Sequence, residues 1–138
     1  MAIQHFIQQF DDMVNKLDCH VGEEIFVPQF IAHVPFMPRL NRSSYRAYMQ
    51  GFRITFPDFC QEINDSFVAN SRLVLRVSYR GTHKRDFLGI PATYREITMS
   101  GISIFQIEND LVVENWTELD IFGVIQQMSV VNLMSSLS

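Results

Sequence analysis

The side chains best suited to chemistry gather in residues 112–120 (VVENWTELD), late in the chain. Successive side chains of a strand point to opposite faces, so one face of this segment carries Glu114, Trp116, Glu118 and Asp120. On a cavity wall, apolar neighbours would raise the pKa of such a carboxyl group and make it a general acid or base near neutral pH. On an outer face the same row would be ordinary wet surface. The spacing leaves both interpretations open.

Other reactive groups give weaker signals. Arg76, in the middle of an alternating segment, is either a solvated edge charge or an anion-binding group in a pocket. The four histidines are too scattered to indicate a zinc site, and no metal is expected. The two cysteines lack CxxC spacing and read as small buried hydrophobes. Phosphate-loop, dinucleotide, zinc-protease and serine-hydrolase signatures do not occur in the sequence.

The first half of the chain predicts helices. Apolar residues recur at helical spacing over residues 3–17, and Tyr45, Tyr48, Met49 and Phe52 repeat in the same way before Pro57. Ser43 or Ser44 is the expected N-cap of that second helix. Residues 30–34 predict a brief strand, and residues 35–44 a loop over one mouth of the domain.

The second half predicts an antiparallel sheet. Residues 72–80, 97–108 and 111–120 are expected strands, and Asn109-Asp110 is a turn that joins the last two. Residues 58–63 predict only a few strand-like or irregular positions. Helices followed by strands define an α+β fold, here a single domain over residues 1–128 with a tail at 129–138.

Composition excludes several partners. The chain has 138 residues, 11 basic against 15 acidic side chains and a formal net charge of −4, so it lacks the positive field that nucleic-acid binding needs. Without a signal peptide or a long apolar segment, neither secretion nor membrane spanning is predicted, and a cytoplasmic location is expected. Twelve Phe, four Tyr and one Trp predict an interior packed or lined with rings.

The segment from Arg80 to Met128 carries a family resemblance. It contains GTH, FLGIP, a GISIF strand, an IEN turn, a tryptophan followed by an aspartate at the strand end, and a closing GVIQQ helix. FPDF lies upstream at residues 56–59. From about Tyr45 to Met128 the chain resembles the SnoaL-like polyketide cyclases of the NTF2-like superfamily.

The resemblance implies a cone, in which a curved antiparallel sheet wraps around the N-terminal helices and encloses an apolar cavity. It also implies a homodimer paired through the sheet, a hydrophobic polyketide-like ligand and no cofactor. In these cyclases an aldol condensation closes a ring, and one aspartate near the end of the tryptophan-bearing strand is the general acid/base. Asp120 matches that position.

The resemblance also indicates groups around Asp120. Gln106 stands where the cyclases place a histidine, and glutamine can donate a hydrogen bond but cannot shuttle a proton. His33 is a third candidate for the catalytic set. The expected substrate-binding residues are Arg76, His83, Trp116, Glu118, Tyr48, Phe52 and Phe105.

Two alternatives remain open at this stage. One is another NTF2-like enzyme, an isomerase or epoxide hydrolase in which Asp120 or Glu118 works with Arg76. The other is a non-catalytic module that binds a small molecule. An Asp120 carboxylate open to bulk water would favour the second, since an exposed carboxylate is a poor base at pH 7.

Overall fold

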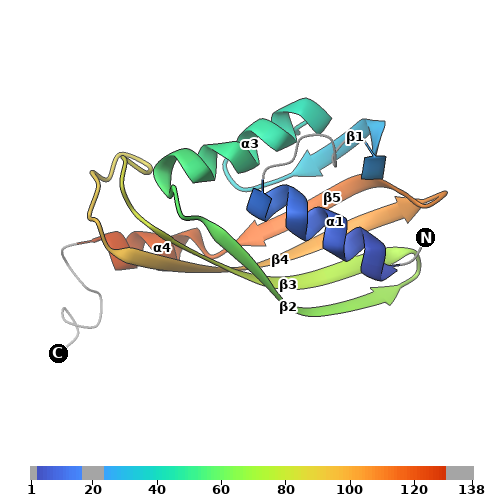
Figure 1. The fold of residues 1–138 in the computed structure, drawn as a ribbon. Coiled ribbons are helices and arrows are strands. Elements are labelled where there is room, and N and C mark those ends of the chain that lie inside the picture. Colours follow the sequence, from blue (N-terminus) through green and yellow to red (C-terminus); the bar gives the residue numbers. More distant parts are fainter. Residues whose placement is uncertain (1–2, 17–23, 130–138) are drawn as a thin grey trace.

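The computed structural model describes residues 3–16 and 24–129, which form a five-stranded sheet and three helices (Figure 1). The strands are β1 (Phe26–His33), β2 (Cys60–Ala69), β3 (Arg72–Thr82), β4 (Glu96–Glu108) and β5 (Leu111–Leu119). The helices are α1 (Ile3–Lys16), α3 (Arg42–Thr55) and α4 (Ile121–Met128). The predicted tail at 130–138 lies outside the described residues.

The sheet order is β1-β5-β4-β3-β2. Strands β2 to β5 form an antiparallel meander as expected, whereas β1 pairs with β5 in parallel, so the sheet is mixed. Asn70 and Ser71 turn the first hairpin and Asn109 and Asp110 the last, all with φ between 51° and 64°. Positive φ at both central residues suits the right-handed twist of the strands, and the predicted Asn109-Asp110 turn is confirmed.

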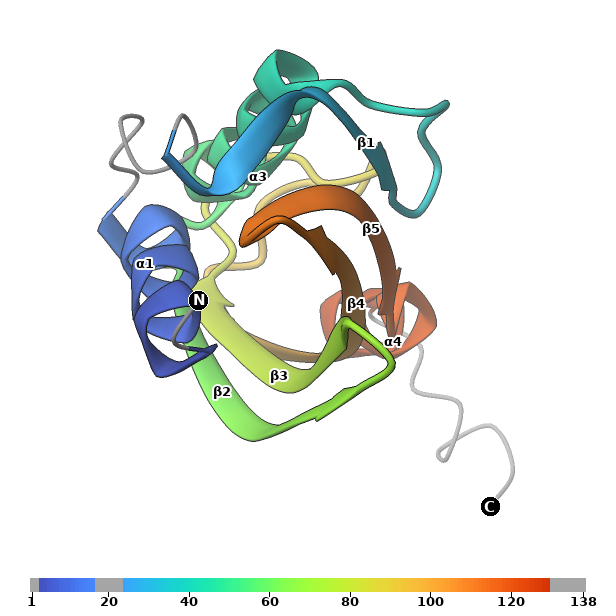
Figure 2. The ribbon, with the colours of Figure 1, turned by 90° about the vertical axis from the view of Figure 1, so that its right-hand side faces the viewer.

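Seen along its axis, the sheet curls into an open cone (Figure 2). Helices α1 and α3 lie on its concave side, and α4 packs against β4 with Ile121, Val124 and Met128 buried in the core. The α+β cone is therefore confirmed. The curled sheet and the two inner helices position every group described below.

Helix α3 begins earlier in the sequence than predicted. Its N-cap is Asn41, whose side chain accepts a hydrogen bond from the Ser44 backbone N–H at 2.8 Å. The Ser44 hydroxyl in turn accepts from the Asn41 N–H at 2.8 Å. This reciprocal capping box makes Ser44 the third helical residue, so the expected cap at Ser43 or Ser44 is wrong.

Two strands are longer than their sequences indicate. Strand β1 runs through Pro28, which an edge strand tolerates, and its register with β5 shifts between Phe26 and Ile31. Strand β2 forms the opposite edge and extends to Ala69, although most of it is exposed. Polar, exposed edge strands lack the apolar alternation by which strands are recognised.

The aromatic side chains pack in groups between the sheet and the helices. Phe6 and Phe10 of α1 meet Phe105 of β4 edge to face, with ring centroids 5.4 and 4.9 Å away. The ring centroids of Phe30 in β1 and Tyr45 in α3 lie 5.2 Å apart. Edge-to-face and tilted pairs of this kind add to the burial of apolar area, so most rings are core.

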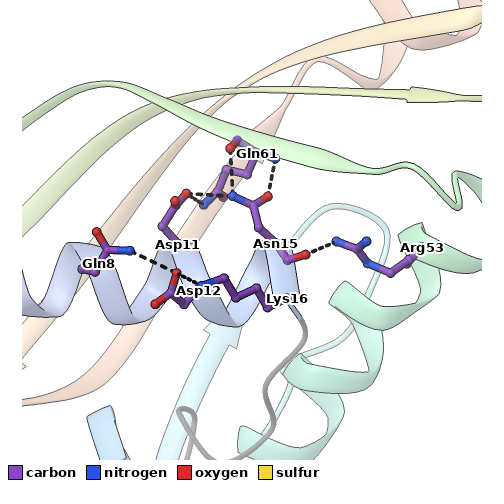
Figure 3. A network of polar contacts seen from close by, with 7 residues as sticks. All are labelled: Gln8, Asp11, Asp12, Asn15, Lys16, Arg53 and Gln61. Carbon is purple, nitrogen blue, oxygen red and sulfur yellow. Dashed lines mark hydrogen bonds and ion pairs between the residues drawn. The ribbon is translucent and has the colours of Figure 1, made fainter.

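Polar contacts fasten α1 to the open edge of the sheet (Figure 3). The Asn15 amide accepts from the Gln61 backbone N–H at 2.6 Å and donates to the Gln61 carbonyl at 3.1 Å, as a neighbouring strand would. The Arg53 guanidinium of α3 donates to the carbonyls of Val14, Asn15 and Phe59 at 3.2, 2.7 and 3.1 Å. A cation thus satisfies carbonyls at the C-terminal end of α1.

Candidate functional site in the cone

A narrow pocket with a cavity volume of about 30 Å³ lies inside the cone, between the sheet and the two inner helices. Helix α3 supplies one wall through Tyr45, Tyr48, Met49 and Phe52, the face that its helical spacing predicted. The other lining residues are Phe10, Val14, Val34, Phe59, Tyr79, Met99, Ser103, Thr117 and Leu119. Every one of these side chains is uncharged, so the pocket suits a neutral apolar molecule.

Three tyrosine hydroxyls are the main polar groups of this pocket. Burial raises the pKa of Tyr48 to about 12. Burial, and then the neighbouring Tyr48, raises the pKa of Tyr79, while burial followed by Tyr79 and Tyr48 raises that of Tyr45. At neutral pH all three stay protonated and can donate. None of these hydroxyls has a hydrogen-bond partner among the described residues.

A row of buried polar side chains forms the floor of the pocket on β4 and β5. Ser103 Oγ lies 2.8 Å from Thr117 Oγ1, which donates to Asn115 Oδ1 at 2.9 Å. Asn115 Nδ2 donates to the Ile104 carbonyl at 3.2 Å. Ser103 and Thr117 line the pocket, and Asn115 is fully buried behind them. Their mutual hydrogen bonds allow polar groups inside an otherwise apolar interior.

A second pocket, with a cavity volume of about 20 Å³, adjoins the first and shares Phe52, Phe59, Tyr79 and Met99 with it. A hollow of about 130 Å³, lined by Tyr48, Gly51, Phe52 and Phe87, shares lining residues with both pockets. Phe52 and Phe87 stand between this hollow and the second pocket, with ring centroids 6.3 Å apart. We therefore expect a ligand to enter the interior through this hollow.

Among the predicted substrate-binding residues, Tyr48 and Phe52 line the inner pocket. Phe105 is fully buried against Phe6 and Phe10 and belongs to the core. The remaining predicted residues lie elsewhere. The structure thus brings together part of the apolar wall that the sequence indicated, but not the polar groups assigned to it.

Asp120 lies outside the cone. It is exposed and forms the N-cap of α4, where Oδ1 accepts from the Gly123 backbone N–H at 2.9 Å. A Cβ atom at Gly123 would collide with this carboxylate, which explains the glycine three residues later. The expected position of Asp120 on the cavity wall is therefore wrong, because the side chains of β5 that face inward are Asn115, Thr117 and Leu119. Its general acid/base role stays a prediction.

Arg76 and Glu118 share an outer hollow of about 380 Å³ with Asp120, on the face of the sheet opposite the inner pocket. Arg76 Nε lies 3.9 Å from Asp65 Oδ2, and both side chains are more exposed than buried, at 60% and 63%. Exposed pairs at such distances contribute little stability. The three charged residues that were expected to line the cavity therefore lie together in this outer hollow.

His33, Trp116 and Gln106 also lie on the outer face. His33 Nε2 is 2.6 Å from Glu114 Oε2, and its ring stacks on Trp116 with centroids 5.7 Å apart. The Arg72 guanidinium lies over the Trp116 ring, with its Cζ 5.2 Å from the ring centroid. Its Nε donates a hydrogen bond to Gln106 Oε1 at 2.9 Å. Gln106 therefore binds an arginine, and the expectation that it faces the cavity is wrong.

Residues of the GTH and FPDF motifs mainly hold the end of β3 and the loop between β3 and β4 in place. His83 is fully buried, and its Nδ1 accepts from the Thr93 N–H at 3.2 Å. Asp58 of FPDF accepts from the Thr82 N–H and hydroxyl at 2.6 and 2.7 Å. These two bonds hold the pKa of Asp58 below its usual range. His83 does not line the pocket, so its predicted contact with substrate has no geometric support.

The described residues contain no group of three His, Cys, Asp or Glu side chains placed to hold a metal ion. Over residues 3–16 and 24–129, no helix is long and apolar enough to cross a membrane.

The fold and the pocket together define a cone of the NTF2-like type. The family model of the SnoaL-like polyketide cyclases matches residues 4–128, and the chain belongs to this family. TsrD from Streptomyces laurentii is a structural relative with 26% identity and a TM-score of 0.82, over 94% of this chain and 96% of that one. A comparison with curated proteins gave no match.

Two further structures share the fold. IdmH from Streptomyces antibioticus is 22% identical with a TM-score of 0.84, over 94% of this chain and 100% of that one. A SnoaL-like polyketide cyclase from Agrobacterium tumefaciens is 17% identical with a TM-score of 0.77, over 94% and 99% of the two chains. Likeness at these identities concerns the fold alone.

Tyr45, Tyr79, Ser103, Thr117 and Asn115 were not expected as site residues. The signal for Tyr45 and Tyr79 was present, because both lie on the apolar faces of their helix and strand. The hydroxyl row had no such signal. Its residues interrupt apolar faces, and only the cross-strand pairing of Ser103 with Thr117 shows why burial is tolerated.

Proposed function

We propose that the protein binds a neutral, hydrophobic, polyketide-like small molecule in the inner pocket, and that tyrosine hydroxyls orient its oxygen atoms. One observation carries this proposal: an uncharged, largely apolar pocket is lined by Tyr45, Tyr48 and Tyr79, whose hydroxyls have no partner among the described residues. An unpartnered donor in an apolar site favours a ligand that supplies an acceptor.

The finer proposal is ring closure. A ketone held among the tyrosines would gain hydrogen bonds at its carbonyl oxygen as negative charge develops there. The confined pocket would also hold the ends of a flexible chain close together, which lowers the entropic part of the barrier. Asp120 matches the position of the acid/base aspartate of the cyclases that the sequence resembles, but here it caps α4 on the outside. A cyclase would need Asp120 for turnover, whereas a binding module would not.

Binding can be tested with 4-methylacetophenone, followed by two-dimensional NMR of the intact protein. Saturable shifts at Tyr79, Ser103 and Thr117 are expected. Tyr79→Phe should weaken the affinity by roughly three- to tenfold, the effect of one lost hydrogen bond. Tyr94→Phe is the matched control, because Tyr94 is 72% exposed. Equal losses in both variants, or shifts confined to the outer face, would contradict the proposal.

A homodimer paired through the convex face of the sheet is the second part of the proposal. Ile102 and Phe67 are 49% and 58% exposed. Ile102 pairs with Arg76 on one side and Glu118 on the other. Sedimentation of wild type against Ile102→Glu tests it. A wild-type monomer at micromolar concentration would refute the dimer without affecting the pocket.

A further inference from the structure

The hydrogen bonds among the side chains of the pocket floor all run in one direction, from donor to acceptor. The row runs from Ser103 through Thr117 and Asn115 to the backbone carbonyl of Ile104. All three side chains are buried, with 2%, 8% and 0% of their surface exposed. These side chains therefore hydrogen-bond to one another rather than to water. The acceptor at the end of the row, the Ile104 carbonyl, fixes which atom donates in each of the other bonds.

The Ile104 carbonyl can only accept a hydrogen bond, so the Asn115 atom that faces it at 3.2 Å must be the amide nitrogen. Asn115 Oδ1 then faces Thr117 and can only accept. Thr117 must give its one proton to Asn115, at 2.9 Å. It has none left for Ser103, so Ser103 donates to Thr117 across the 2.8 Å contact.

Both hydroxyl protons of the floor are thus directed away from the ligand. What Ser103 and Thr117 present to the pocket is lone pairs. We infer that this floor is a hydrogen-bond acceptor site, and that the ligand carries a hydroxyl group there, as a phenol, an enol or an alcohol. The inference rests on the proposed function, since it needs a ligand in the inner pocket.

The two ends of the pocket then differ in what they recognise. The tyrosine side offers donors for a carbonyl oxygen, and the β4–β5 floor offers acceptors for a hydroxyl. A molecule with both groups, such as a hydroxyketone or its enol form, satisfies both ends in one orientation. Reversing it would place two acceptors together at the floor, which costs the hydrogen bond and leaves a buried group unsatisfied.

The test compares p-cresol with its methyl ether, 4-methylanisole, as probes of the intact protein. The two differ in a hydroxyl hydrogen and a methyl group, so only p-cresol can donate. Affinities are measured by NMR titration. Wild type should bind p-cresol on the order of three- to tenfold more tightly, as expected for one hydrogen bond to a buried acceptor.

Two variants then alter the floor in opposite ways. Thr117→Val removes the acceptor of the Ser103 proton, so the Ser103 hydroxyl can turn and donate to either probe, and the preference should fall to near one. Ser103→Ala leaves Thr117 bonded to Asn115 with a free lone pair, so the preference should persist. Thr98→Val is the matched control, because Thr98 is an exposed residue of the same strand, and it should leave the ratio unchanged.

The outcomes separate the two proposals. If p-cresol and its ether bind wild type equally well, or if Thr117→Val keeps the wild-type preference, the directed floor is refuted while the pocket stands. If neither probe nor 4-methylacetophenone binds, the proposed function fails and this inference fails with it. General loss of structure in Thr117→Val would show as loss of the dispersed NMR signals, and the preference is compared only in folded protein; the wild-type preference then decides the question alone.

Discussion

Replacing Asp120 by Ala and by Asn separates its role as the cap of α4 from the acid/base role that its family implies. The cap contributes one hydrogen bond, from the Gly123 N–H to the carboxylate at 2.9 Å. Loss of a polar N-cap costs about 1 kcal/mol, within a range of roughly 0.5–2. Asparagine caps helices nearly as well, so Asp120→Asn should lose only a few tenths of that.

Gly123 supplies a second, coupled measurement. In wild type, Gly123→Ala brings a Cβ atom into the Asp120 carboxylate, so the cap must move and about 1 kcal/mol of stability is lost. In the Asp120→Ala background the obstacle is gone, and the same change should stabilise the helix by about 0.5–1 kcal/mol. The coupling energy between the two positions is therefore about 1.5–2 kcal/mol.

Urea unfolding followed by the fluorescence of Trp116, the single tryptophan, measures all four proteins of this cycle. Binding of 4-methylacetophenone should be the same in each, since Asp120 does not line the inner pocket. Additive effects at the two positions would refute the capping argument. A large loss of turnover in Asp120→Asn, with stability intact, would instead establish the acid/base role.

Four further changes test other parts of the structure. Arg53→Ala should lower the free energy of unfolding by about 2–3 kcal/mol in urea titrations, because three carbonyls lose their donor, and Arg53→Lys should recover part of it. The lowered pKa of Asp58 contributes stability that is complete above pH of about 4 and is lost as the pH falls through the folded-state pKa; melting curves of Asp58→Asn should lack this acid slope. The raised pKa of Tyr48 contributes stability that is present below pH of about 10 and is lost toward pH 12, and Tyr48→Phe should reduce that alkaline loss. Gly51→Trp should slow ligand association severalfold in stopped-flow measurements by filling the hollow beside Phe52, because a side chain at Gly51 points into open space; Gly51→Ala should leave the rate unchanged and stabilise α3 by about 0.5–1 kcal/mol.

The sequence predicted the elements whose patterns are local. The helical repeat of Tyr45, Tyr48, Met49 and Phe52 identified both α3 and the face that lines the pocket. The alternation around Asn109-Asp110 identified the β4–β5 hairpin. In both cases the periodicity of the apolar residues and the preferences of the turn residues suffice.

The sequence did not determine which face of β5 points inward. Both faces of this strand carry polar residues, and a carboxylate beside a tryptophan fits a cavity wall as well as a wet surface. The choice depends on pairing with β4, where Thr117 lies opposite Ser103 and Asn115 opposite Phe105. Motif resemblance pointed to Asp120 without its geometry, because an aspartate that caps a helix and one that transfers protons look alike in sequence.

The parallel pairing of β1 with β5 affects how the chain folds while it is being synthesised. Phe26 must meet Val112, and His33 must meet Trp116, so the wall of the cone that β1 completes does not exist until β5 has left the ribosome. Such long-range pairing slows folding. During synthesis, the apolar residues of β1 and α3 remain uncovered, and a holding chaperone is the natural safeguard for that interval.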